Sequence, residues 1–468
     1  MSMALVETLR RQLGAAQVLT DGDLSAWELD WRRRWRGRAL AVVRPGSTAE
    51  VATVLQLAAQ HRVAVVPQGG NTGLVGGGVP DASGTQLLLS LQRLNRIRGI
   101  DDANLTLCAE AGCVLQHVQQ AAAERGLLLP LSLAAEGSCT IGGNLATNAG
   151  GTQVLRYGNA RASCLGLEVV TASGEVMHGL SGLRKDNTGY DLRDLFIGSE
   201  GTLGVITAAT LALQPRPAAT MTALASCASL DACVGLLGRA RTALGPGLTG
   251  YEVMNQLSLE LVARHLPGLQ QPLQAAAWTV LLELSDHESE SHARAAFEGL
   301  LGGALEDGVI ADASVAQSLA QSRTMWHLRE AIPLAQAEEG LNIKHDIALP
   351  VSRIASFCAA TDAALARALP GVRLVNFGHL GDGNLHYNVQ APAGADAAAF
   401  LARHEADANH IVYDAVAAHD GSISAEHGVG VLKRDELPRY KDATALALMR
   451  AVKAALDPLG LLNPGRVL

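Results

Sequence analysis

Residues 67–78, PQGGNTGLVGGG, hold six glycines in twelve positions, and this loop constrains the fold more than any other segment of the chain. Apolar strands are predicted over residues 40–43 and 63–66, and Ser47 with Glu50 three residues later has the capping-box spacing for the helix between them. The loop therefore directly follows a strand. Because glycines let backbone N–H groups approach a phosphate closely, we predict a pyrophosphate site here, with a flexible hinge as the alternative.

The spacing of the glycines disfavours two other nucleotide-binding folds. The loop does not read GxGxxG, and the GxG steps that begin at Gly381 and Gly428 lack glycine at the sixth position. No GxxxxGK[ST] motif occurs in the chain. A Rossmann dinucleotide domain is therefore disfavoured and a P-loop nucleotidase is excluded.

The length of 468 residues predicts two or three domains. Pro215 and Pro217 mark a boundary because proline disfavours both helix and central strand. We expect domains over residues 1–215 and 216–425, followed by a segment over residues 426–468 that contains a helix at residues 444–456.

Composition and charge restrict the partners and the compartment. A formal charge of −8 with 3% aromatic residues argues against nucleic-acid binding, which needs a basic footprint. No apolar stretch reaches the ~20 residues of a membrane-spanning helix, and the first residues carry no export signal, so a cytoplasmic protein is expected. Seven cysteines without a CxxC pair are expected to be reduced, buried thiols.

Three further motifs carry a resemblance to a known family. Residues 137–151 read GSCTIGGNLATNAGG, residues 183–192 read LRKDNTGYDL, and residues 198–204 read GSEGTLG. With the glycine loop, they resemble the vanillyl-alcohol-oxidase-type, or PCMH-type, FAD family, and within it the D-2-hydroxyglutarate and D-lactate dehydrogenases. The resemblance implies an α+β fold: a PCMH-type FAD-binding domain of two subdomains, an α/β substrate domain with an antiparallel sheet, and a small helical C-terminal region that completes the active site.

The resemblance also implies which residues contact FAD. One set would cradle the pyrophosphate, a second would line the flavin, and a third would contact it through the backbone. In that order they are Pro67, Gly69, Gly70, Asn71, Thr72, Gly73 and Leu74; Ser138, Gly142, Gly143, Asn144, Thr147, Asn148 and Gly151; and Val205 and Ile206. Relatives that attach the flavin covalently often have a histidine at the position of Asn71, so noncovalent FAD is expected.

A candidate metal site follows from residues 375–389, VNFGHLGDGNLHYNV, without any family. Asp382-Gly383 is typical of a two-residue hairpin turn, and counting outward pairs His379 with His386, and Phe377 with Asn388. Directly opposed residues have Cβ atoms about 5 Å apart, close enough for two imidazoles to reach one ion. By themselves, paired histidines are more often structural.

A second motif, Ser424-Ala-Glu-His-Gly-Val-Gly430, adds a carboxylate and an imidazole. Two histidines and one glutamate with an open position form the ligand set of catalytic rather than structural zinc. In the resembling dehydrogenases, His379, His386 and Glu426 match the metal ligands and His427 matches the catalytic base. We expect zinc first, with manganese or cobalt also suited to this ligand set.

This set of groups suits the oxidation of an alcohol. Hydride leaves an alcohol carbon readily only while the hydroxyl loses its proton, which a metal and a histidine together promote near neutral pH. We therefore expect His427 to abstract the proton while the substrate carbon delivers hydride to flavin N5.

Arg329 and Lys344 match substrate-binding positions of the same family, and both residue types hold carboxylates. Asn388 would hydrogen-bond the same ligand. Pro333 stands where the 2-hydroxyglutarate enzymes carry a threonine, and proline cannot donate that hydrogen bond. D-2-hydroxyglutarate is the expected substrate, with D-malate, D-lactate or another D-2-hydroxy acid as alternatives.

Other functions remain open at this point. A same-fold oxidase would use oxygen, whereas the resemblance favours a dehydrogenase that passes electrons to an electron-transfer flavoprotein or a quinone. A non-catalytic FAD subunit of a glycolate-oxidising complex would not need the His379, His386, Glu426 and His427 set. A purely structural zinc role leaves the glycine loops unexplained. The sequence leaves the oligomeric state open, a homodimer being one expectation.

Overall fold

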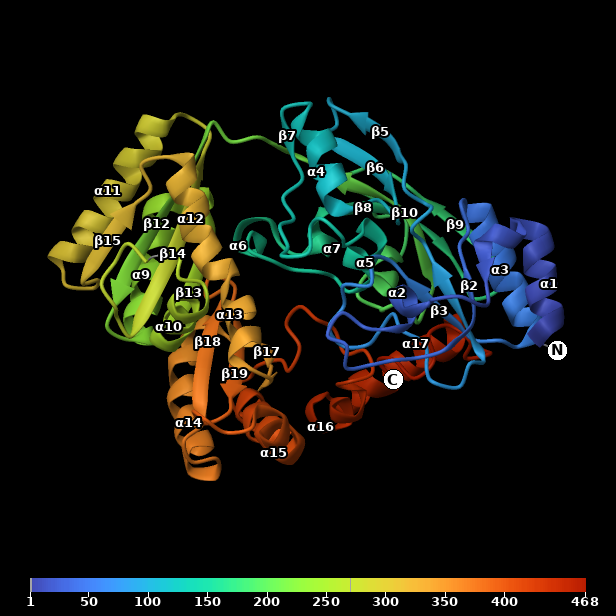
Figure 1. Ribbon diagram of the computed structural model, residues 1–468. Helices are drawn as coiled ribbons and strands as arrows, with labels where there is room; N and C mark the ends of the chain where they lie inside the picture. The colour runs from blue at the N-terminus through green and yellow to red at the C-terminus, as the bar shows by residue number, and fades with distance from the viewer. Residues whose placement is uncertain (1, 270) are drawn as a thin grey trace. The chain divides into compact units, whose positions relative to one another are not determined.

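The computed structural model describes residues 2–269 and 271–468, and they fold into two compact units (Figure 1). Unit 1 comprises Met1–Gly150, Gly158–Arg216 and Glu426–Leu468. Unit 2 comprises Gly151–Tyr157 and Pro217–Ala425. The chain therefore returns to unit 1 for its last segment, at the residue that follows Ala425.

The first sheet of unit 1 has the strand order β1-β2-β4-β3, in which β2, β4 and β3 are parallel and β1 is antiparallel to β2. Its strands are β1 (Val18–Leu19), β2 (Ala39–Val43), β3 (Val65–Gln68) and β4 (Gln86–Ser90). Helices α1 (Ser2–Leu13) and α3 (Thr48–His61) pack together beside it, and their apolar side chains share a core with the strands (Figure 1). The glycine loop leaves the carboxyl end of β3.

The predicted capping box is present at the start of α3. The Ser47 hydroxyl accepts a hydrogen bond from the Glu50 backbone N–H (3.2 Å). The Glu50 carboxylate in turn accepts one from the Gly46 N–H (2.7 Å), one residue earlier than the usual reciprocal partner. The helix ends at His61, and Arg62 caps it in the left-handed conformation (φ 53°).

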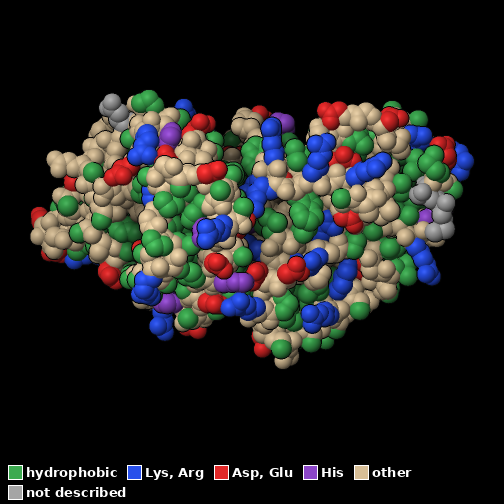
Figure 2. All heavy atoms as spheres, turned by 60° about the horizontal axis from the view of Figure 1, so that its bottom comes forward, with side chains coloured by type: hydrophobic (Ala, Val, Ile, Leu, Met, Phe, Trp, Pro, Cys, Tyr) green, Lys and Arg blue, Asp and Glu red, His purple; other side chains and the backbone are tan. Residues whose placement is uncertain are grey.

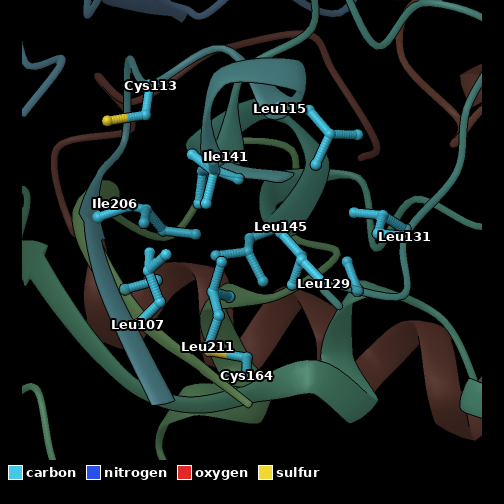
Figure 3. Close-up of a cluster of buried hydrophobic side chains, with 14 of the residues drawn as sticks. Leu107, Cys113, Leu115, Leu129, Leu131, Ile141, Leu145, Cys164, Ile206 and Leu211 are labelled. Atoms are coloured by element: carbon cyan, nitrogen blue, oxygen red, sulfur yellow. The ribbon is translucent and has the colours of Figure 1, made fainter. Parts of the chain in front are cut away.

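The second sheet of unit 1 is antiparallel, in the order β5-β6-β10-β8-β9. Its strands are β5 (Ile97–Asp101), β6 (Thr106–Glu110), β8 (Cys164–Val170), β9 (Val176–Gly179) and β10 (Val205–Ala212). The short helix α5 (Ile141–Ala146) packs on β10, and Figure 3 shows Ile141 and Leu145 pointing toward Ile206 and Leu211. This core anchors the second glycine motif against the sheet.

The remaining elements of unit 1 are short, except for two helices. They are η1 (Ala15–Gln17), α2 (Ser25–Glu28), α4 (Leu115–Ala123), β7 (Leu127–Leu128), α7 (Ala160–Ser163), α8 (Arg193–Phe196), β11 (Gln214–Pro215), η4 (Arg434–Glu436), α16 (Leu437–Tyr440) and α17 (Ala443–Leu456). The predicted C-terminal helix is therefore confirmed as α17. Lys453 of α17 donates hydrogen bonds to the carbonyls of Thr202 (2.7 Å) and Leu462 (2.8 Å), which joins the last segment to unit 1.

Unit 2 is built on one sheet in the order β15-β12-β14-β13-β18-β19-β16, with β17 also paired to β19. All of its pairings are antiparallel. The strands are β12 (Ala219–Cys227), β13 (Leu248–Asn255), β14 (Trp278–Asp286), β15 (Asp312–Val315), β16 (Asn342–Ile343), β17 (Asp346–Ala348), β18 (Arg373–Gly378) and β19 (Asn384–Gln390).

Helices cover both faces of this sheet. They are α6 (Val154–Tyr157), α9 (Leu230–Leu244), η2 (Gly245–Gly247), α10 (Gln256–His265), α11 (Glu290–Glu306), α12 (Leu319–Glu330), α13 (Ile332–Glu339), η3 (Val351–Arg353), α14 (Ile354–Ala368) and α15 (Ala397–Ala418). Helices α9 and α11 pack against each other and the sheet, whereas α10, α12 and α13 share a core with Met254, Val375 and Phe377. The sheet face that α12 and α13 cover carries most of the polar residues of the candidate site in unit 2.

The surface agrees with the composition. On the face drawn in Figure 2, acidic and basic side chains are interspersed, as expected of a protein with no basic footprint. Of the helices in the described part of the chain, none combines the length and apolarity that crossing a bilayer requires. The seven cysteines are free thiols, and all but Cys108 are buried.

Candidate active site

The glycine loop forms one wall of a cavity in unit 1 that holds about 1030 Å³ of space free of atoms, open solvent included. Twelve of the residues predicted to contact FAD line it: Pro67, Gly69, Gly70, Asn71, Thr72, Gly73, Gly142, Gly143, Asn144, Thr147, Val205 and Ile206. The glycine loop, the second glycine motif, the GSEGTLG motif and the start of β10 thus line the same cavity.

The other four predicted positions do not line this cavity. Leu74 is absent from the wall, and Ser138 lines a neighbouring hollow instead. The Asn148 side chain accepts a hydrogen bond from the Arg161 N–H (3.0 Å), which holds the start of α7. Gly151 belongs to unit 2.

The loop is held close to the second glycine motif. A Cβ atom on Gly70 would lie 2.0 Å from the Ser138 carbonyl oxygen, so only glycine fits at that position. Thr140 lines the cavity, and its hydroxyl oxygen is buried without a hydrogen-bond partner among the described residues. A buried polar atom of this kind needs a partner, which a polar ligand in the cavity would provide.

Asn71 shapes the loop from within. Its backbone is left-handed (φ 54°), a conformation that asparagine tolerates better than most residues. Its side-chain amide donates hydrogen bonds to the carbonyls of Ala26 (3.0 Å) and Leu29 (2.9 Å). The residue thus fixes the loop to the chain near α2.

His427 lines the same cavity, so the predicted base lies beside the glycine loops within unit 1. The turn that follows it is tied down twice. The Val431 N–H donates to the Val75 carbonyl (2.9 Å), and the Glu200 carboxylate accepts from the N–H groups of Val429 (2.7 Å) and Gly430 (2.8 Å). The position of His427 therefore depends on residues far away in the sequence.

Glu200 is a functional candidate that the sequence reasoning missed, although it lies within the GSEGTLG motif. Its side chain is buried, and burial raises the pKa of its carboxyl group, against the lowering effect of the two backbone N–H groups. The residue has a left-handed backbone (φ 53°), which is uncommon for residues other than glycine. The acidic residue between the glycines of GSEGTLG is the sequence signal that could have identified it.

In unit 2, the hairpin that carries the histidine pair has a different register from the predicted one. Strand β18 pairs Phe377 with His386 and Val375 with Asn388, so His379 lies in the connection beyond the end of the ladder. The predicted pairs of His379 with His386 and of Phe377 with Asn388 are therefore wrong.

The physical reason is a longer connection than Asp-Gly alone predicts. The His379 carbonyl accepts hydrogen bonds from the N–H groups of Asp382 (3.2 Å), Gly383 (3.1 Å) and Asn384 (3.2 Å), which closes a wider turn. At Gly378 (φ 155°) a Cβ atom would lie 2.6 Å from the Asn384 carbonyl oxygen, so glycine is needed where β18 ends. The ring centroids of His379 and His386 nevertheless lie 5.5 Å apart, and their nearest ligand nitrogens lie within 4.8 Å.

A buried carboxylate stands behind His379. Glu252 of β13 accepts hydrogen bonds from His379 Nδ1 (2.6 Å) and from Arg329 Nε (2.8 Å). Burial would raise the pKa of Glu252, but the charges of His379 and Arg329 outweigh it and hold that pKa below its ordinary value. The Arg329 guanidinium also stacks over the Phe377 ring, 4.7 Å from its centroid.

Two buried amides extend this polar face along β19. Asn388 lies two residues beyond His386 on the same side of the strand, and its amide donates to the Gln336 side-chain oxygen (2.9 Å). The Gln336 Nε2 is buried without a hydrogen-bond partner among the described residues. Gln336 is thus a second residue that the sequence reasoning missed.

Pro333 is the second residue of α13, because the chain ends α12 at Glu330 and starts a new helix at Ile332. Proline is tolerated there because the first turn of a helix has no internal acceptor for that N–H. Pro333 therefore belongs to the helix that follows the helix of Arg329. Lys344 lies between β16 and β17 and is partly buried.

Comparison with known proteins then gives the family. Residues 39–179 match the family described as "FAD binding domain", and residues 216–467, more than half of the chain, match "FAD linked oxidases, C-terminal domain". The chain belongs to the FAD-linked oxidases. As a member of that family it is a flavoprotein oxidoreductase that binds FAD.

Several FAD-linked oxidases of known name are similar over nearly the whole chain. The D-2-hydroxyglutarate dehydrogenase of Bos taurus is 41% identical over 97% of this chain and 81% of its own length. That of Xanthomonas citri pv. viticola is 41% identical over 98% of this chain and 96% of its own, and that of Arabidopsis thaliana 38% over 99% and 81%.

Solved structures confirm the predicted fold class. Substrate-bound p-cresol methylhydroxylase superposes with a TM-score of 0.77 at 17% identity, covering 99% of this chain and 96% of the other. The 4-ethylphenol oxidase of Gulosibacter chungangensis has a TM-score of 0.73 at 17% identity, covering 100% and 97%. At this identity the likeness concerns the fold alone, which is the PCMH-type fold.

The prediction of a cytoplasmic location is wrong as stated. The relatives from Arabidopsis thaliana, Bos taurus and Rattus norvegicus are named as mitochondrial proteins. The name of the Xanthomonas citri relative gives no compartment. The absence of an export signal was therefore no basis for assigning a compartment.

Proposed function

We propose that this FAD-linked oxidase is a dehydrogenase of D-2-hydroxy acids that uses noncovalent FAD and a divalent metal, with D-2-hydroxyglutarate as its first substrate. The observation that carries the proposal is the position of His427, which lines the cavity walled by the FAD-binding glycine motifs. The names of relatives that are 38–41% identical supply the substrate class.

FAD, when bound, supplies the acceptor for the hydride that leaves the substrate carbon. The residues that line the cavity in unit 1 would hold it, with backbone N–H groups of residues 67–78 toward the pyrophosphate. Asn71 donates its amide to two backbone carbonyls and carries no nucleophile for covalent attachment, which supports noncovalent binding.

The metal ligands in this proposal are His379, His386 and Glu426. Glu252 binds the Nδ1 atom of His379, so Nε2 is the ring nitrogen that would bind the ion. A carboxylate behind a ligand histidine is a common feature of metal sites. The Ala425 N–H donates to the Asp346 carbonyl (3.2 Å), and Asp346 pairs with His386 across β17 and β19.

Glu426 follows Ala425 directly, and consecutive Cα atoms are about 3.8 Å apart. Glu426 is therefore the next residue after Ala425, whose backbone is hydrogen-bonded to the strand neighbour of His386. A divalent cation at this donor set supplies a Lewis acid that makes a nearby hydroxyl easier to deprotonate. Zinc is the first candidate for such a set of two histidines and one glutamate.

His427 takes the proton of the substrate hydroxyl in this scheme. Imidazole has an ordinary pKa near 6.5, so the neutral ring that accepts a proton is available at neutral pH. The ties from Glu200 and Val75 hold the backbone that follows His427, so the ring does not have to be ordered at the moment of reaction.

Arg329 and Lys344 are proposed to hold the carboxylates of the substrate, and Asn388 to donate to the same molecule. Pro333 offers no hydroxyl, but Gln336 lies three residues later on α13, and its Nε2 has no hydrogen-bond partner within the described part of the chain. We propose that the distal end of the substrate contacts this amide pair. D-malate and D-lactate are the alternatives with a shorter distal end.

The test is anaerobic titration of the FAD absorbance with D- and L-2-hydroxyglutarate, malate and lactate, before and after treatment with a chelator. We expect D-2-hydroxyglutarate to bleach the flavin and L-2-hydroxyglutarate not to bleach it. After chelation, bleaching by D-2-hydroxyglutarate should be slow. Equal bleaching by both enantiomers, or bleaching unaffected by a chelator that removes all bound metal, would refute the scheme. Reoxidation by an electron-transfer flavoprotein or a quinone, in preference to oxygen, would separate a dehydrogenase from an oxidase.

A further inference from the structure

The buried side chain of Glu252 joins two groups to which the proposed function gives different tasks. It lies on β13, two residues before Met254, whose side chain packs with Met325 and Leu328 of α12. Glu252 therefore faces α12, where Arg329 lies. Its exposed fraction is 0%, and those of Arg329 and His379 are 6% each, so the three charges or dipoles interact with little screening by water.

The two hydrogen bonds use His379 Nδ1 and Arg329 Nε, which leaves the other nitrogens of both side chains facing away from Glu252. His379 gives Nδ1 to Glu252 Oε1 (2.6 Å), which fixes the tautomer that presents Nε2 on the opposite side of the ring. Arg329 gives Nε to Glu252 Oε2 (2.8 Å), which leaves both terminal nitrogens for a bidentate carboxylate. One carboxylate thus orients a metal-ligand candidate and a substrate-binding candidate.

A stabilising role alone explains this arrangement poorly. Burial of an ion pair costs desolvation that its attraction often only balances, and well-packed apolar residues are usually as stable. If Glu252 only neutralised Arg329, its second oxygen would not need the His379 ring at 2.6 Å. The Phe377 ring, stacked on the Arg329 guanidinium and 5.0 Å from the His386 ring, joins the same group of side chains.

We propose that Glu252 is a positioning residue that couples the metal-binding histidine to the carboxylate-binding arginine. The inference rests on the proposed function. Because the same carboxylate holds both groups, its loss weakens metal binding and substrate binding together, although Glu252 touches neither ligand. A residue with a merely structural role would lower the stability of unit 2 and leave the two binding constants of the folded protein unchanged.

The test replaces Glu252 with glutamine in the FAD-loaded protein. Glutamine has the same shape, but its amide offers one acceptor and cannot serve both donors. Glu110→Gln is the matched control, because Glu110 is an equally buried carboxylate in unit 1 that pairs with Arg96 (2.9 Å) and Arg98 (3.3 Å). Zinc affinity is measured by competition with a chromophoric chelator, and binding of the unreactive product, 2-oxoglutarate, by the change in flavin absorbance.

For Glu252→Gln we expect zinc and 2-oxoglutarate each to bind about 10- to 100-fold more weakly, the loss typical of a carboxylate behind a metal ligand. Glu252→Asp, which keeps the charge, should recover part of both affinities, and Glu110→Gln should stay within about threefold of the wild type. Affinities of Glu252→Gln that match those of Glu110→Gln would overturn the inference. Weakening of only one of the two affinities would also overturn it.

A His379→Ala variant separates this inference from the proposed function. If His379→Ala binds zinc as tightly as the wild type, the proposed metal site itself is wrong. If His379→Ala loses zinc while Glu252→Gln keeps it, the metal site stands and only the role of Glu252 is refuted. Should Glu252→Gln fail to fold, Glu252→Asp carries the same test, with both affinities expected to fall between those of the wild type and of His379→Ala.

Discussion

Replacement of Glu200 by glutamine should disable the turn that holds His427 without emptying the FAD site. The carboxylate accepts hydrogen bonds from the N–H groups of Val429 (2.7 Å) and Gly430 (2.8 Å), and each bond to a charged acceptor contributes about 1.5–3 kcal/mol. Glutamine can accept only one of them and directs its own N–H₂ at the other. The ordered turn should be destabilised by about 2–3 kcal/mol, which corresponds to a roughly 30- to 150-fold smaller population of the turn that holds His427 in place.

The assay is anaerobic rapid mixing of the FAD-loaded variant with D-2-hydroxyglutarate, with bound FAD and metal measured separately. Glu50→Gln is the matched control, since Glu50 also accepts a hydrogen bond from a backbone N–H (2.7 Å) in unit 1, but at the start of α3. We expect flavin reduction in Glu200→Gln to slow by the stated factor with FAD retained, and Glu50→Gln to reduce at the wild-type rate. Wild-type reduction by Glu200→Gln, or loss of FAD as its only defect, would refute the reasoning.

Three further predictions concern other parts of the chain. Gly70→Ala should lose most of its FAD because the new Cβ would lie 2.0 Å from the Ser138 carbonyl oxygen, whereas Gly99→Ala, with open space around its Cβ, should keep it; equal FAD contents by absorbance would count against the cradle. Gln336→Leu should raise the KM for D-2-hydroxyglutarate more than that for D-lactate, and a uniform change in both would separate Gln336 from the distal end of the substrate. Burial would raise the pKa of Glu339, but hydrogen bonds from Arg373, His265 and Arg264 outweigh this effect and hold that pKa at about 2, below its ordinary 4.5. The stability that Glu339 contributes is therefore present above pH 4.5 and is lost as the pH falls toward 2. After allowance for solvent screening this amounts to about 2 kcal/mol, so urea midpoints at pH 6 and pH 3.5 should differ more for the wild type than for Glu339→Gln.

The sequence could predict the glycine loops that line the cavity because their information is local. Glycines that follow a strand need no distant partner to be interpreted, and Gly70 meets Ser138 as such a tight loop requires. The polar residues of β19 are local in the same sense, since Asn384, His386, Asn388 and Gln390 alternate with apolar neighbours and so share one face.

Features that depend on distant partners could not be predicted. Glu252 is a single acidic residue in a buried strand, which signals a partner, but its partners lie 77 and 127 positions away in the sequence. The hairpin register failed for a different and local reason. An Asp-Gly step favours a two-residue turn, but the His379 carbonyl collects three backbone N–H groups and widens the connection.

The central claim, that His427 accepts the hydroxyl proton while the substrate carbon gives up hydride, is tested most directly by the rate of flavin reduction in His427→Asn. Asparagine fills similar space and keeps a polar side chain, but it does not take up a proton near neutral pH. The claim predicts that FAD and metal stay bound at wild-type levels while reduction by D-2-hydroxyglutarate slows by about 10²- to 10⁴-fold, the usual contribution of a general base. Reduction within about threefold of the wild-type rate in the fully loaded variant would contradict it.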